Sequence, residues 1–146
     1  MSDRYDPSPT FRFRVEISGV TVSRFSEVSG LEVQQQTEDY AEGGQNSHLH
    51  RLPTRFKYSD LILKRGIAED GKPLWEWLEK ALSGEITPHD VTVNLYDAEG
   101  KSALRTWNFA DAYPIKWSAT ALAAETSAIA IETLSLAHQG LRLPST

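Results

Sequence analysis

The segment from Phe11 to Ser18 alternates strictly between apolar and polar side chains, and this pattern limits what the chain can fold into. The apolar residues occupy the odd positions: Phe11, Phe13, Val15 and Ile17. A period of two places successive side chains on opposite faces of an extended backbone, so the segment is predicted as a β-strand with one buried face. Gly19 ends the pattern. A half-buried strand needs a second layer of structure over its apolar face, which restricts the chain to folds built on a sheet.

Further strands follow along the chain. A second run begins at Leu31 and Val33, turns polar through residues 34–36 and continues to about Tyr40. The next stretch, 42–47, is rich in glycine and polar residues and is predicted as a loop. Alternation at residues 91–95, a turn at 97–100 and a second apolar run at 104–109 predict a β-hairpin.

The apolar positions change phase inside two of the predicted strands. In the segment 55–65 they are first even and then odd: Phe56, Tyr58, Leu61 and Leu63. Near the C-terminus they are first odd and then even: Ile129, Ile131, Leu134 and Leu136. A β-bulge produces such a change of side-chain phase. We therefore expect one bulge in the segment 55–65 and another near Glu132–Thr133, both of which would help the sheets to curl.

One helix is predicted between Pro73 and Gly84. Its apolar residues follow at intervals of three and four: Leu74, Trp77, Leu78, Ala81 and Leu82. Proline is favoured in the first helical turn, and glycine is a natural stop. The sequence as a whole predicts a mainly β (α+β) fold, with two packed antiparallel β-sheets or a part-barrel and one flanking α-helix. We expect a single domain over residues 1–146, in which residues 1–9 form a flexible N-terminal extension.

Composition narrows the classes of function. The chain has no cysteine and carries a net charge of −5, which disfavours thiolate metal sites and the basic surface of a duplex-DNA reader. The N-terminal residues form no apolar signal segment, and no apolar run approaches the ~20 residues of a membrane-spanning helix. We therefore expect a protein that is made in the cytosol and does not insert into membranes.

A possible phosphate-binding loop is the most specific pattern that suggests an enzyme. Residues 66–72 fit the pattern G-x-x-x-x-G-K, but the Ser or Thr that would hold magnesium is replaced by Pro73. Glu69 and Asp70 would also place negative charge where phosphate should bind. We interpret the segment as a turn from strand to helix, and we expect neither catalytic residues nor a cofactor.

Histidines, tryptophans and a basic cluster are the other candidates. We interpret the histidines as exposed loop residues, because a zinc site needs three or four ligands: His48, His50, His89 and His138. The tryptophans could form a stacking platform but more often pack in cores and interfaces: Trp75, Trp77, Trp107 and Trp117. Lys57, Lys64 and Arg65 form a basic cluster that we expect to meet an acidic neighbour such as another subunit.

Four motifs in order resemble a known family. They are FSEVSGLE at 25–32, EDYAEGGQN at 38–46, RLPTRFKYSDLILKRGI at 51–67 and IAIETLSLAHQGL at 129–141. Together with the strand at 11–17 they resemble the phage-T4-like tail tube family, and most of all the inner tube subunits of extracellular contractile injection systems. The resemblance covers roughly residues 10–141. Thr54 and Arg24 stand where family members often have glycine, which affects local turns.

The resemblance implies a structural role. It implies two packed sheets with one helix, six subunits in a ring, and rings that stack into a hollow tube inside a contractile sheath. The implied partners are further copies of the chain, the sheath, the baseplate and the spike, with an effector protein or DNA passing through the lumen. We expect subunit contacts at a set of residues in and near the loop: Tyr40, Glu42, Gly43, Gly44, Asn46, Leu52, Lys57, Lys64 and Arg65. We expect Gln34, Gln36 and Glu38 to face the lumen.

Two alternatives remain open at this point. The chain could form a specialised ring at the tip of the tube, between tube and spike, because the same fold serves both. It could also be a β-sandwich module that binds carbohydrate or protein through aromatic residues such as Trp107 and Trp117. The sequence does not distinguish a virion tail from a phage-tail-like particle, and it does not identify the cargo or the target cell.

Overall fold

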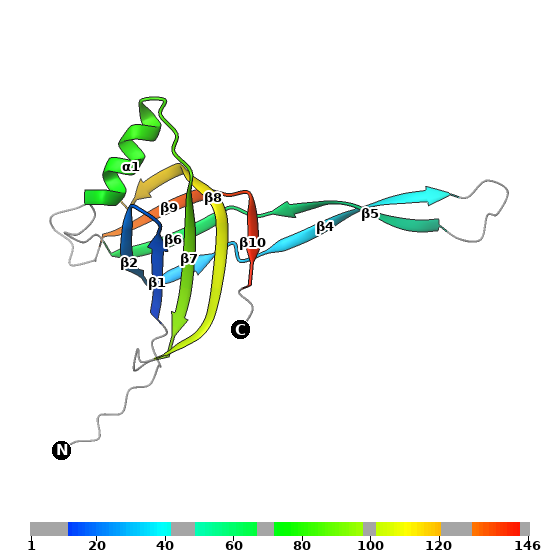
Figure 1. Ribbon diagram of the computed structural model, residues 1–146, viewed down its shortest axis with the longest axis horizontal. Coiled ribbons are helices and arrows are strands. Elements are labelled where there is room, and N and C mark those ends of the chain that lie inside the picture. The colour runs from blue at the N-terminus through cyan, green and yellow to red at the C-terminus, as the bar shows by residue number, and fades with distance from the viewer. Residues whose placement is uncertain (1–11, 42–48, 67–71, 98–101, 121–129, 144–146) are drawn as a thin grey trace, which may run out of the picture.

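The computed structural model describes residues 12–41, 49–66, 72–97, 102–120 and 130–143 (Figure 1). These residues form strands and one helix in the order β1 Arg12–Ile17, β2 Thr21–Phe25, β3 Glu27–Ser29, β4 Val33–Ala41, β5 Leu49–Tyr58, β6 Leu61–Gly66, α1 Lys72–Leu82, β7 His89–Tyr96, β8 Ala103–Ala119, β9 Ile131–Ala137 and β10 Gly140–Arg142.

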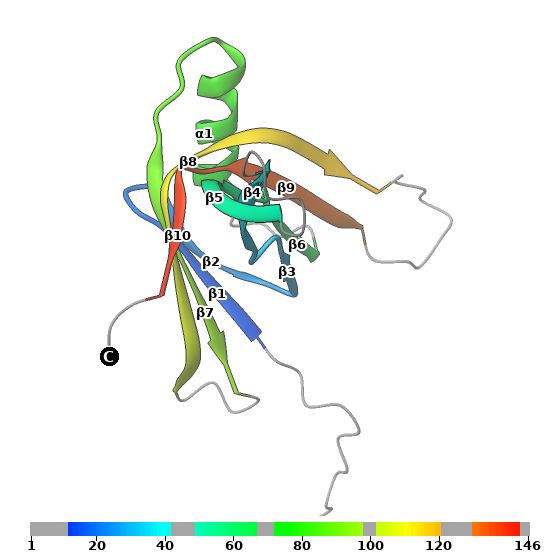
Figure 2. The same cartoon turned by 90° about the vertical axis from the view of Figure 1, so that its right-hand side faces the viewer.

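An eight-stranded antiparallel sheet forms the body, in the order β2-β1-β7-β8-β9-β6-β3 with β10 also paired to β8. The sheet makes two layers because β8, which is 17 residues long, belongs to both. The first part of β8 pairs with β7 and the last part pairs with β9. Figure 2 shows β8 curving from the layer of β1 and β7 into the layer of β9. The prediction of two packed antiparallel sheets, or a part-barrel, with one helix is confirmed.

The two ends of this sheet are consecutive in the chain. Strand β2 lies at one end and β3 at the other, and only Ser26 separates them. The backbone N–H of Ser26 donates a hydrogen bond of 2.9 Å to the carbonyl of Lys64 in β6. The segment 21–29 therefore borders both layers and holds them together on one side.

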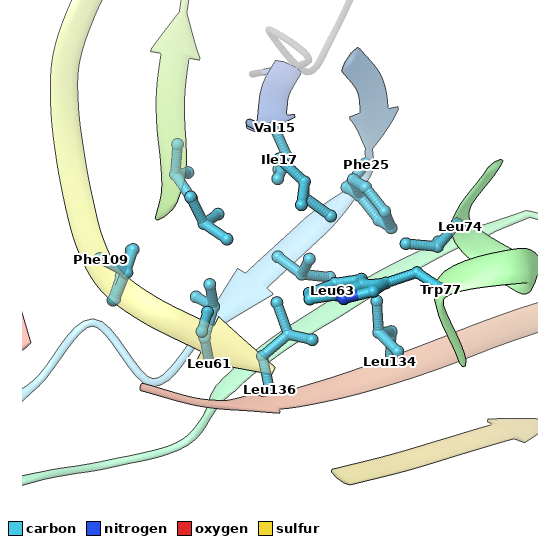
Figure 3. Packing of buried hydrophobic residues seen from close by; sticks show 13 residues of the cluster. Val15, Ile17, Phe25, Leu61, Leu63, Leu74, Trp77, Phe109, Leu134 and Leu136 are labelled. Atoms are coloured by element: carbon cyan, nitrogen blue, oxygen red, sulfur yellow. The ribbon is translucent and has the colours of Figure 1, made fainter. Parts of the chain in front are cut away.

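The core lies between the layers, and both contribute to it (Figure 3). The largest fully buried side chains are all apolar: Phe109, Ile17, Leu61, Leu63, Leu134, Leu136, Val15, Val91 and Val93. Burying a side chain of this kind stabilises the fold by about 1.5–3 kcal/mol. Val15 and Ile17 confirm the predicted inward face of the first strand.

Helix α1 covers part of this core with Leu74, Trp77 and Leu78. The indole N–H of Trp77 donates 2.9 Å to the carbonyl of Thr87, which ties the helix to the segment before β7. The helix begins one residue before the predicted proline, and Gly84, with φ of +94°, follows its end as expected. The prediction that Leu82 lies on the inward face is wrong, because its side chain is 75% exposed.

Neither predicted bulge lies where it was expected. The segment 55–65 is two strands in different sheets, with β5 ending at Tyr58 and β6 starting at Leu61. Strand β9 keeps a continuous register with β6 from Ile131 to Leu136, so it has no bulge at Glu132–Thr133 on that side. The irregularity is in β8, where Ile115 is the extra residue between two paired positions. Ile129 lies outside the described residues.

Strands β4 and β5 form a separate two-stranded sheet that projects from the body as a long arm (Figure 1). We call this pair the β4–β5 arm. Its register shifts between Gln35 and Thr37, where β5 contains one extra residue. No helix among the described residues is long and apolar enough to cross a membrane.

Candidate functional site: the β4–β5 arm

The arm is unusual because its side chains are not buried against the rest of the chain. Every side chain described over 33–40 and 50–57 is exposed. A strand in a stable sheet normally buries at least one face, and an isolated two-stranded hairpin is only marginally stable in water. Within the described residues β4 pairs only with β5, so both outer edges of the arm are open. These features indicate an arm that is completed by something outside this chain.

The register of the arm sorts its side chains into two faces. Cross-strand partners share a face, and the partners Gln34 with Lys57, Glu38 with Leu52 and Tyr40 with His50 all lie on the same one. Gln36 belongs to this face by its position in β4. We call it the polar face of the arm, defined by Gln34, Gln36, Glu38, Tyr40, Leu52 and Lys57.

The opposite face carries the apolar side chains nearest the body. Phe56 is 59% exposed and Val33 is 48% exposed. Toward the far end this face becomes polar, where Arg51 lies 3.9 Å from the Asp39 carboxylate and donates 3.0 Å to the Thr37 hydroxyl. We call it the apolar face of the arm, defined by Val33, Gln35, Phe56, Thr37, Pro53, Asp39 and Arg51.

The base of the arm is held in a fixed direction by a close backbone approach. Gly30 has φ of +89°, and a Cβ atom placed there would lie 1.8 Å from the carbonyl oxygen of Asp60. Only glycine allows both this conformation and this approach. The chain entering β4 therefore crosses directly over the link between β5 and β6.

An aromatic cluster also packs against the base of the arm, at the end of β5. The His138 ring lies 4.8 Å from Phe109 and 5.5 Å from Tyr58, the last residue of β5. Its Nε2 atom is 3.0 Å from the carbonyl of Ser59. His138 is therefore packed and partly buried rather than an exposed loop residue, and that prediction is wrong. His89 is the first residue of strand β7 and is half-buried, with its ring 5.5 Å from that of Trp77.

Lys64 and Arg65 are adjacent in sequence but occupy different environments. Lys64 is half-buried, and its ammonium group lies 3.4 Å from the carboxylate of Glu27 on the neighbouring strand. Arg65 is only 5% exposed, and its Nε donates 2.6 Å to the Glu132 carboxylate. Trp117 donates 3.2 Å to the other oxygen of Glu132, and the Arg65 guanidinium lies 5.0 Å from the Phe25 ring. Arg65 therefore meets an acidic residue as predicted, but this residue belongs to the same chain and lies in the interior, so the predicted contact of Arg65 with another subunit is wrong.

The remaining predicted contact residues divide into two groups. Tyr40, Leu52 and Lys57 lie together on the polar face of the arm and are exposed. The other four lie outside the described residues: Glu42, Gly43, Gly44 and Asn46. The three residues predicted to face the lumen, Gln34, Gln36 and Glu38, share the polar face with the first group.

The other candidate sites do not come together. Residues 67–71 of the phosphate-loop pattern lie outside the described residues, and Lys72 and Pro73 are exposed at the start of α1. Among the described residues, no group of three or more His, Cys, Asp or Glu side chains could hold a metal ion. Trp107 is half-buried and packs against the core, whereas Trp75 and Trp117 meet edge to face at 5.2 Å.

Comparisons with known proteins identify the family of this chain. The family model for the T4-like virus tail tube protein gp19 matches residues 9–142, and the chain therefore belongs to this family. No curated protein matches the chain.

Solved structures show the same fold. A chain in the cryo-EM structure of the baseplate of the anti-feeding prophage is 26% identical, with a TM-score of 0.77 and coverage of 99% of this chain and 97% of that one. A chain in the PVC sheath–tube complex, an extracellular contractile injection system in its extended state, is 24% identical, with a TM-score of 0.80 and coverage of 96% and 93%. Hcp1 from Flavobacterium johnsoniae is 13% identical, with a TM-score of 0.55 and coverage of 90% and 94%.

Proposed function

We propose that this chain is the repeating subunit of the inner tube of a contractile injection system or phage tail. Six copies form a ring, and rings stack into a hollow tube through which a cargo is delivered. The observation that carries the proposal is the β4–β5 arm, whose side chains over 33–40 and 50–57 are exposed and whose edges are open within the described residues. Membership of the tail tube family supports the same role.

The proposed role is mechanical, with no bond made or broken and no cofactor. Each copy places its arm on another copy, and a head-to-tail contact of this kind generates rings or helical assemblies. Sheath, baseplate and spike proteins are the other proposed partners. The tube is assembled in the bacterial cytoplasm and becomes part of a virion tail or a released phage-tail-like particle.

We assign the two ends of the polar face to different surroundings. Near the body, Gln34, Gln36 and Glu38 face the lumen, where uncharged amides and a carboxylate let acidic cargo pass without sticking. Farther out, Tyr40 is 54% exposed and contacts another copy. Leu52, which is 48% exposed and is the cross-strand partner of Glu38, lies at the border between the lumen-facing part and this contact. Lys64 and the loop residues Glu42, Gly43, Gly44 and Asn46 belong to the same proposed contacts. Lys57 is the cross-strand partner of Gln34 near the body, so its proposed contact with another copy lies at the border of the lumen-facing part. Arg65 is left out of them because it is buried.

A specialised ring at one end of the tube is the second candidate. It is favoured by the likeness to a chain of the anti-feeding prophage baseplate at 26% identity. A chain in the tube-terminating cap of the same particle has a TM-score of 0.80 at 22% identity, which shows that the fold also occurs there. Copy number per particle separates the candidates, because a tube subunit is present in many rings and an end subunit in one.

Replacing Leu52 and Tyr40 with aspartate is expected to weaken assembly at least about tenfold without unfolding the chain. Both side chains are exposed, so the free energy of unfolding of a single copy should change by less than about 0.5 kcal/mol. Sedimentation velocity measures the assembly. The wild-type chain should reach a particle six times its 16.3 kDa mass, whereas the double variant should stay a single copy.

The matched control is Val22→Asp with Leu104→Asp. Val22 and Leu104 are 48% and 55% exposed, close to Leu52 and Tyr40, but lie on the body. Assembly of the control should equal that of the wild type. A wild-type chain that remains a single copy at every concentration would contradict the proposed function.

A further inference from the structure

One row of polar side chains crosses the large sheet on the face that points away from the core. Arg24 on β2 is the cross-strand partner of Arg14 on β1, and Arg14 is the partner of Asn94 on β7. Thr106 on β8 is in turn the partner of Asn94. Arg14 precedes the fully buried Val15, so its side chain lies on the outer face, and both arginines are exposed. We call these four residues the arginine row, defined by Arg24, Arg14, Asn94 and Thr106.

The two positive charges of the arginine row lie side by side without compensation. Cross-strand partners have Cβ atoms about 4.5–5.5 Å apart, and like charges directly opposite each other weaken a sheet. Within the part of the chain that the structure describes, neither guanidinium group takes part in an ion pair. An anion bound between Arg14 and Arg24 would remove this repulsion.

The neighbouring row shows what a balanced row looks like on the same face. It contains Glu16 on β1, which is the cross-strand partner of Thr92 on β7. Thr92 donates 2.9 Å to the Asn108 amide oxygen, and Asn108 is the partner of Arg142 on β10. This row therefore carries one negative and one positive charge, whereas the arginine row carries two positive charges.

Asn94 adds further hydrogen-bond donors to the arginine row. The Thr106 hydroxyl donates 2.7 Å to the Oδ1 atom of Asn94. This bond uses the amide oxygen and leaves the amide nitrogen with two N–H donors and no acceptor among the described residues. A guanidinium group carries five N–H donors and no acceptor. Arg24, Arg14 and Asn94 therefore present mainly donors, and an oxyanion is the ligand that accepts from such a set.

The charge of the rest of the chain limits the size of this ligand. The net charge is −5, and the carboxylate of Glu16 lies on the same face one row away. A long polyanion such as a nucleic acid is repelled by this field, whereas a small dianion meets mainly the two arginines. Arginine binds a phosphate group through two parallel N–H···O bonds, and neighbouring strands about 4.8 Å apart let one phosphate accept from both side chains.

We propose that Arg14, Arg24 and Asn94 bind a dianionic phosphate group, either as inorganic phosphate or as a small phosphate monoester. All three side chains come from one copy, so the site lies beyond the proposed function and does not depend on assembly. Bound phosphate compensates the two guanidinium charges and links β2, β1 and β7 across their outer face.

Phosphorus NMR of inorganic phosphate, titrated against the full-length protein at constant ionic strength, tests this site. Bound phosphate tumbles with the protein, so its signal should broaden and the effect should saturate with a Kd on the order of 1 mM or below. Arg14→Gln combined with Arg24→Gln should weaken binding at least about tenfold, because the charged donors are lost. Both side chains are exposed, so the variant should keep its fold, which circular dichroism checks.

The matched control is Arg105→Gln combined with Lys116→Gln. Both residues are exposed and lie outside the arginine row, and the control loses the same two positive charges. A general effect of net charge is therefore equal in the two double variants. The control should bind phosphate within about twofold of the wild type, and equal binding by the two double variants would overturn the proposal.

Asn94→Asp provides an independent test, because it places a carboxylate beside Arg14 and keeps an acceptor for Thr106. The chain then supplies the missing anion itself, so phosphate binding should fall at least about tenfold. Without phosphate the variant should also melt at a higher temperature than the wild type. Unchanged phosphate binding by this variant would exclude Asn94 from the site and overturn the proposal.

Competition experiments distinguish the sources of the phosphate group. Displacement of inorganic phosphate by phenyl phosphate would show that the site recognises the group wherever it is carried, and no displacement would assign it to inorganic phosphate. Two results would overturn the proposal: no saturable broadening with the wild-type protein, or displacement by a single-stranded oligonucleotide at the same concentration of phosphate groups.

Discussion

Replacing Gly30 with alanine is expected to lower the free energy of unfolding by at least about 3 kcal/mol, with a fall of roughly 10 °C in melting temperature. The added Cβ would lie 1.8 Å from the Asp60 carbonyl oxygen and 3.2 Å from the Cα of Leu61. Both atoms belong to the backbone, so neither can move aside as a flexible side chain would. The residue would also keep φ of +89°, which is unfavourable for alanine.

Gly84 provides the matched control for this prediction. It has almost the same conformation, with φ of +94°, but a Cβ there would meet nothing within 4 Å. Gly84→Ala should therefore lower the free energy of unfolding by only about 1 kcal/mol, because alanine is unfavourable at a positive φ but meets no other atom there. Urea unfolding of both variants in the Leu52→Asp, Tyr40→Asp background removes the contribution of assembly to stability. Equal losses for the two glycines would contradict the crossing of backbones at the base of the arm.

Replacing Arg65 with alanine is expected to lower the free energy of unfolding by about 3–5 kcal/mol. The Glu132 carboxylate, whose side chain is 14% exposed, would lose the charged donor that lies 2.6 Å away and would remain in the interior. The indole N–H of Trp117 would still donate to it, but this donor carries no charge. Removing one partner of a buried pair is costly because the remaining charge is no longer compensated. Chemical unfolding of the variant measures the loss.

The neighbouring residue supplies the control, because Lys64→Ala breaks an ion pair at the surface. Lys64 and Glu27 have side chains that are 42% and 59% exposed, and such pairs contribute at most about 1 kcal/mol. Arg65→Met combined with Glu132→Leu should lose less stability than Arg65→Ala, since no charge then stays buried. A loss below about 1 kcal/mol for Arg65→Ala would show that Arg65 is not held in the interior as described.

The sequence predicted the parts of the fold in which one strand face is buried without interruption. The alternation that ends at Ile17 and the three-and-four spacing from Leu74 to Leu78 each reflect one continuous contact with the core. The full length of β8 could not be predicted in this way. Its backbone bends at Asp111, where φ is +48°, and bulges at Ile115, so the period of two is lost after Phe109.

The odd or even spacing of apolar residues also could not show where a strand ends. The change between Tyr58 and Leu61 has the same pattern whether a strand bulges or the chain leaves one sheet for another. Arg65 was expected to contact another subunit, but its acidic partner is Glu132 of the same chain, which is 67 residues away in the sequence and could not be recognised from local pattern. The packed position of His138 depends on a similarly distant contact, with Ser59.

The arm illustrates what the sequence could and could not show about the site. The sequence correctly predicted a strand that turns polar after Val33 and continues to about Tyr40. The division of its side chains between two faces depends on the pairing with β5 and on the extra residue opposite Gln36. The arginine row could not be predicted, because it exists only in the register of β2, β1 and β7.

An electron-microscopy reconstruction of the assembled wild-type protein tests the account most directly, because it shows where each β4–β5 arm lies. We predict closed rings of six copies, in which every arm rests on a neighbouring copy. Tyr40 and Leu52, which are exposed in a single chain, should then be covered, while Gln34, Gln36 and Glu38 face the lumen. Single copies only, or an assembly whose arms stand free in solvent, would contradict the account.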